Sequence, residues 1–154
     1  MFEVPLDAWY VWAGLGLVSV AVGGIALGLP TAAPPTAGPA ADAIDNVATS
    51  PNRAQTTVEL SAEKLRLSRH AIALDTAGGT ARARFVFGPV TPVSDGRLRR
   101  LLRGDRPADV FRSKRGFRSA LETARSRHHR WQSAPETLTA RRVRWGDVNA
   151  TVVG

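Results

Sequence analysis

Arginine is the residue type that dominates the chemistry this sequence could perform. Between Arg97 and Arg130 there are 12 Lys and Arg residues against three acidic residues, a local charge of +9. Guanidinium groups form bidentate pairs with phosphate and carboxylate oxygens, so a dense run of them favours an anionic partner. We expect nine arginines to contact such a partner: Arg97, Arg99, Arg100, Arg103, Arg115, Arg118, Arg125, Arg127 and Arg130.

Three interpretations of this basic segment remain open. Arginines beside aliphatic residues suit the surface of an anionic lipid membrane, where apolar side chains enter the headgroup boundary. They also suit nucleic-acid phosphates, with Trp131 available to stack on a base, although we regard nucleic acid as the less favoured partner. The third interpretation is a solvated surface in a protein from a high-GC genome, since the chain has 19 Arg and two Lys.

Residue types that carry catalysis or bind metals are scarce. The 154 residues include no cysteine and three histidines, which excludes disulfides, thiolate zinc ligands and a cysteine nucleophile. His128 and His129 are adjacent, so on a helix their side chains would point about 100° apart. No Gly-rich phosphate loop, nucleophile elbow or His-Glu-x-x-His pattern occurs. We expect a non-enzymatic protein with no catalytic residue, no cofactor, no metal and no identifiable small-molecule substrate.

An apolar segment near the N-terminus predicts a membrane span. No charged residue occurs from Ala8 to Leu29. At 1.5 Å per residue these residues would reach about 33 Å as a helix, enough to cross a hydrocarbon core of ~30 Å. We therefore expect a single-pass helix in the cell membrane.

Aromatic residues and glycines within this segment suggest how the span would be placed. Trp9, Tyr10 and Trp12 would lie at the membrane interface, where amphipathic rings prefer the headgroup layer. Gly24 and Gly28, four residues apart, would allow close approach of another helix.

Cleavage and orientation of the N-terminal segment are separate questions. Glu3 and Asp7 give it an acidic start, which favours an uncleaved anchor over a secretory signal, although cleavage stays an alternative. Neither flank carries Lys or Arg close to the span, so the positive-inside rule does not orient it. Asn149-Ala150-Thr151 matches the N-glycosylation pattern and favours an extracytoplasmic body.

Composition divides the rest of the chain into a linker and a body. Residues 30–41 hold four prolines and no charge, which favours a stiff linker. Residues 42–154 form the expected body, with a short helix opened by Asp42. Apolar and polar residues alternate from 56 to 93, which predicts antiparallel strands, including a hairpin of 70–75 with 80–88.

The end of the chain and the basic segment complete the expected body. Alternation at Val143/Trp145 and again from Val148 predicts strand structure around a bulge or turn at 146–147. Residues 94–135 are expected as a basic helical insertion, with apolar stripes at 98, 101 and 102 and at 117, 120, 121 and 124. The expected fold class is α+β: an N-terminal transmembrane helix followed by a small antiparallel β-rich body with a basic helical insertion.

Three blocks of the sequence resemble an uncharacterised single-span membrane protein family of haloarchaea: Met1–Trp12, Phe85–Val93 and Val143–Val148. The order of span, short helix and β-rich body is also similar to archaeal pilin-like proteins. Leu6-Asp7 stands where pilins carry a basic residue and glycine, so this resemblance implies an accessory rather than a polymerising subunit.

Two functions follow from the sequence. The favoured one is a non-enzymatic, membrane-anchored accessory or assembly component of a pilus-like or secretion machine at the cell surface. Its partners would be membrane lipid and other proteins of the assembly. The alternative is a cytoplasm-facing, membrane-anchored protein that binds anionic lipid or nucleic acid through its Arg-rich segment.

Overall fold

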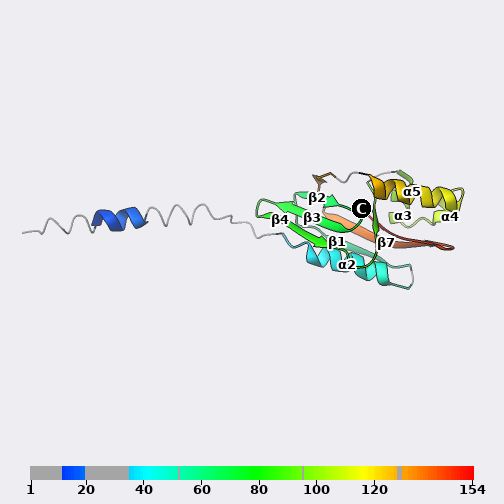
Figure 1. Ribbon diagram of the computed structural model, residues 1–154, viewed down its shortest axis with the longest axis horizontal. Helices are drawn as coiled ribbons and strands as arrows, with labels where there is room; N and C mark the ends of the chain where they lie inside the picture. The colour runs from blue at the N-terminus through cyan, green and yellow to red at the C-terminus, as the bar shows by residue number, and fades with distance from the viewer. Residues whose placement is uncertain (1–11, 20–34, 52, 95, 128–129) are drawn as a thin grey trace, which may run out of the picture. The chain divides into compact units, whose positions relative to one another are not determined.

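The computed structural model describes residues 12–19, 35–51, 53–94, 96–127 and 130–154 of the chain. The chain divides into two compact units, Met1–Thr31 and Ala32–Gly154, and each is described by itself. In the first unit, residues 12–19 are helical and exposed. The second unit holds two sheets and the remaining helices (Figure 1).

The transmembrane helix in the expected fold class is not supported. No helix in the described ranges is long and apolar enough to cross a membrane. The helical stretch 12–19 spans only about 12 Å at 1.5 Å per residue, well short of a hydrocarbon core. Its glycines, Gly14 and Gly16, are poor helix formers. The rest of the expected span lies outside the described residues. The α+β character of the body agrees with the structure, but the fold class as a whole was wrong.

The first sheet has the order β1-β7-β8-β5 and contains the end of the chain. Strand β1 (Gln55–Glu59) pairs antiparallel with β7 (Thr137–Trp145), and β7 pairs antiparallel with β8 (Val148–Val153). Strand β5 (Val90–Pro92) runs parallel to β8 and forms the other edge. The C-terminal strand is therefore central to this sheet.

The second sheet is antiparallel, in the order β4-β3-β2-β6. Its strands are β2 (Lys64–Leu67), β3 (Ala71–Thr76), β4 (Gly79–Arg84) and the short β6 (Gln132–Ser133). The β3–β4 pair is the predicted hairpin, and Gly79 adopts the positive φ that its tight turn requires. β4 ends at Arg84, so the residues from 85 to 88 form a loop instead of continuing the strand.

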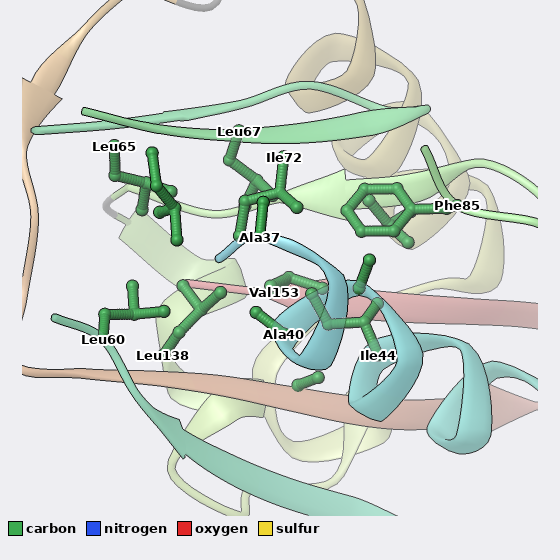
Figure 2. Packing of buried hydrophobic residues seen from close by; sticks show 14 of the residues in the cluster. Ala37, Ala40, Ile44, Leu60, Leu65, Leu67, Ile72, Phe85, Leu138 and Val153 are labelled. Carbon is green, nitrogen blue, oxygen red and sulfur yellow. The ribbon is translucent and has the colours of Figure 1, made fainter. Parts of the chain in front are cut away.

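One hydrophobic cluster lies between the two sheets. Leu65, Leu67 and Ile72 from the second sheet and Leu138 and Val153 from the first all contribute to it. Figure 2 shows Leu65 and Leu138 on the same side of this cluster, and Ile44 of the helix α2 (Gly38–Thr49) near Val153. The helix α2 contacts strands of both sheets. The helix begins four residues before Asp42, inside the segment expected as a linker, because Ala37, Ala40 and Ala41 are buried in this cluster.

A second hydrophobic cluster covers the opposite face of the first sheet. It combines strand residues such as Val143 and Val152 with helix α3 (Gly96–Leu102), helix α4 (Pro107–Val110) and helix α5 (Lys114–Ser126). The predicted stripes are confirmed, since Leu98 and Leu101 of α3 and Phe117 of α5 are buried there. The basic segment is therefore a layer packed on the sheet, with most of its charged residues exposed.

Candidate anion-binding groove

A groove of about 940 Å³ opens between the two sheets beside the segment that connects α5 to β7. Its floor is apolar and includes Leu65 and Leu138, which belong to the core between the sheets. Its rim carries four arginines. The groove is lined by Leu65, Leu67, Pro92, Val93, Ser94, Arg99, Leu102, Arg103, Ala124, Arg127, Arg130, Trp131, Gln132, Ser133, Pro135, Thr137, Leu138, Thr139 and Gly154.

The rim arginines come from three parts of the chain. Arg99 and Arg103 lie four residues apart at α3, so they share the helix side that borders the groove. Arg127 directly follows the last residue of α5, and Arg130 belongs to the connection leading to β6. The buried leucines of α3 fix this placement, because they turn Arg99 and Arg103 away from the core.

Trp131 forms part of the groove wall and is 38% exposed. The guanidinium of Arg66 lies over its ring, 4.9 Å from the centroid. A cation–π contact of this kind favours one ring orientation and keeps the indole at the wall. The expected stacking of Trp131 on a base would therefore have to share the ring with Arg66.

The charge around the groove is one-sided. No Asp or Glu side chain lines the groove in the described part of the chain. Positive charge of this density attracts an anion, and because all four arginines are exposed, added salt should weaken this attraction.

Four of the nine expected anion-contact residues thus meet at the groove, and the other five lie elsewhere. Arg100 pairs with Asp105 at 2.7 Å, and Arg118 pairs with Asp147 at 2.8 Å. The guanidinium of Arg97 lies 5.7 Å from the ring centroid of Phe111. Arg115 is exposed near the start of α5.

Arg125 points inward and has a structural role. Its Nε donates a hydrogen bond of 2.9 Å to Oγ1 of Thr91, a fully buried residue of β5. Its Nη2 donates to the carbonyl of Pro89 at 3.5 Å. Burial lowers the pKa of Arg125, and the nearby Glu122 carboxylate partly opposes this shift. Arg125 therefore ties α5 to the first sheet.

A second basic depression, missed by sequence reasoning, lies on the outer face of the second sheet. We call it the sheet hollow; its volume is about 770 Å³. The strand register places Arg66 and Arg82 on either side of Ala73, and Arg84 opposite Ala71, so the two alanines form the floor between arginines. The alternating arginines of residues 82–84 were visible in the sequence, but their closeness to Arg66 depends on strand order.

The remaining site expectations fall partly beyond the described ranges. Trp9, Tyr10, Gly24 and Gly28 lie outside the described residues. Trp12 begins the helical stretch 12–19 and is 73% exposed. Asn149 is exposed on β8, whereas Thr151 of the same glycosylation pattern is buried. Within the described residues, no group of three or more His, Asp or Glu residues could hold a metal.

Of three comparisons with known proteins, one found a match. A family of unknown function matches residues 3–143. No curated protein and no solved structure matches the chain.

Proposed function

Since the chain belongs to DUF7283, a family of unknown function, we propose its function from the structure of the groove. We propose that it is a non-enzymatic protein that binds an anionic amphiphile. By anionic amphiphile we mean a molecule of the lipid class, with a phosphate or carboxylate head and an apolar body. The observation that carries this proposal is the combination of an arginine rim with a leucine floor in one groove.

The apolar floor favours an amphiphile over a polyanion. Leu65, Leu67 and Leu138 form a buried floor that belongs to the core. Trp131 and Pro135, which are exposed, also line the groove, so an alkyl group would find apolar neighbours there. A nucleic-acid backbone would use the arginines and gain little from the apolar lining. The volume of about 940 Å³ also lies within the usual range of small-molecule sites, roughly 300–1,000 Å³.

The rim supplies the anion contacts that would orient the head group. Guanidinium groups donate paired hydrogen bonds to phosphate and carboxylate, which fixes direction as well as attraction. Arg103 and Arg130 make no ion pair among the described residues, so binding need not first break one.

The test measures binding of decyl phosphate, below its micelle concentration, by isothermal titration calorimetry on the full chain. Decyl maltoside serves as the neutral amphiphile and inorganic phosphate as the head group alone. We expect decyl phosphate to bind at least tenfold more tightly than either, because only it engages both rim and floor.

Matched variants assign the binding to the groove. The double substitution Arg103→Gln with Arg130→Gln should weaken decyl phosphate at least tenfold. Arg112→Gln with Arg115→Gln removes the same charge from exposed positions outside the groove and should change the affinity less than twofold. Equal weakening by both pairs, or equal binding of decyl maltoside, contradicts the proposal. Tighter, rim-dependent binding of an oligothymidylate would favour nucleic acid instead.

The more specific expectations from the sequence stay predictions. These are the haloarchaeal and pilin-like relationship, the accessory role in a surface assembly and the extracytoplasmic position of the body. An amphiphile-binding protein is compatible with such an accessory role, and the calorimetry above tests the binding without assuming it.

A further inference from the structure

Two large apolar side chains are exposed together on the loop that follows β4. Val86 is 77% exposed and Phe87 is 53% exposed. We call this pair the apolar tip. Their neighbour Phe85 is buried in the core between the sheets, so the chain leaves the core and turns outward within two residues.

The apolar tip is held in place by a buried carboxylate. Oδ2 of Asp45 accepts the backbone N–H of Val86 at 2.9 Å, and Oδ1 accepts that of Phe87 at 3.1 Å. The N–H of Phe85 donates to the carbonyl of His70 at 2.9 Å. Because the backbone is already ordered, a partner that meets the tip does not have to fix a mobile loop.

Two arginines, Arg69 and Arg84, lie close to the loop that carries the apolar tip. The N–H of Val90 donates to the carbonyl of Arg69, so the exposed Arg69 lies beside the base of this loop. Arg84 precedes the loop and lines the sheet hollow together with His70 and Phe85. No Asp or Glu lines that hollow in the described part of the chain. Asp45, whose carboxylate accepts the N–H group of Val86, is only 6% exposed.

Exposed apolar residues next to arginines match the surface of an anionic bilayer. Apolar side chains gain by entering the boundary between headgroups and acyl chains, while neighbouring cations pair with lipid phosphates. An acidic protein would complement the arginines, but without an apolar groove of its own it would leave Val86 and Phe87 in water. We infer that the apolar tip, with Arg69 and Arg84, is a docking surface for an anionic lipid bilayer.

Because the chain contains no cysteine, one introduced cysteine can carry a fluorescent label at the tip itself. Phe87→Cys, labelled with the environment-sensitive fluorophore NBD, is mixed in the full chain with vesicles of phosphatidylcholine containing one third phosphatidylglycerol. We expect a blue shift and at least a twofold rise in emission, and no change with phosphatidylcholine alone. Glu59→Cys, labelled on the exposed face of edge strand β1, should stay water-like with both vesicles.

Charge variants complete the test. Adding Arg69→Gln and Arg84→Gln to the labelled chain should at least halve the emission rise, whereas Arg112→Gln with Arg115→Gln should leave it intact. A label at position 87 that stays water-like while the protein sediments with the anionic vesicles overturns the inference. The groove pair Arg103→Gln and Arg130→Gln should leave the label response intact, so tip docking and groove binding can fail independently.

Discussion

The Asp45 carboxylate illustrates how single residues set the shape of the functional surface. It is buried at the side of α2, yet both of its oxygens are used by backbone N–H groups of the loop after β4. Arg125 of α5 likewise joins two elements, because its guanidinium donates a hydrogen bond to the buried hydroxyl of Thr91 in β5. The sequence predicted Arg125 as a contact for an anionic partner and did not single out Asp45.

Asp45→Asn should destabilise the protein by about 1–3 kcal/mol, because one amide oxygen replaces two acceptors and the amide N–H₂ group then faces a backbone donor. Asp42→Asn, an exposed change in the same helix, is the control and should cost less than about 0.5 kcal/mol. Urea unfolding followed by circular dichroism measures both. Equal costs for the two variants would show that the Asp45 contacts contribute nothing to stability.

At the scale of elements, α5 fixes the basic segment on the first sheet. Ser113 caps its start by accepting the N–H of Gly116 at 3.2 Å, and Phe117 lies fully buried between Phe111 and Trp145. This packing brings the end of the helix, at Arg127, to the groove. The groove therefore depends on the second hydrophobic cluster as well as on the arginines themselves.

Phe117→Ala should lower the free energy of unfolding by about 3–5 kcal/mol, the usual cost of a cavity left by a buried aromatic ring. Phe87→Ala removes the same ring from an exposed position and should cost less than about 1 kcal/mol. Urea titration of the two full-length variants gives the comparison. A cost for Phe117→Ala no larger than that for Phe87→Ala would mean that α5 is not docked on the sheet.

Gly146 governs the β7–β8 hairpin through its backbone. Its φ of +63° at the first turn position suits glycine, and Lys114 lies where a Cβ would be added. Gly146→Ala should destabilise the protein by about 1–2 kcal/mol. Asp147→Ala, which removes only the exposed pair with Arg118, should cost about 1 kcal/mol or less in the same unfolding experiment. A larger destabilisation by Asp147→Ala than by Gly146→Ala would contradict the assigned turn.

At the scale of the whole molecule, sequence patterns predicted what depends on neighbours along the chain. Gly78 and Gly79 at the β3–β4 turn predicted the hairpin, and the apolar stripe of α5 predicted the buried face of that helix. The early start of α2 was missed because its small alanines become core residues only through contact with both sheets. The groove was predicted only as a list of arginines, since the approach of Leu65 to Leu138 joins strands 73 positions apart.

The central claim is that an anionic amphiphile occupies the arginine-rimmed groove, and nuclear magnetic resonance tests it most directly. On titration of the full chain with decyl phosphate, we expect the indole N–H signal of Trp131 and the Nε–H signals of Arg103 and Arg130 to shift together with one affinity. The signals of Trp145 and Arg112, outside the groove, should stay in place. Unchanged Trp131, Arg103 and Arg130 signals at saturating decyl phosphate would contradict the claim.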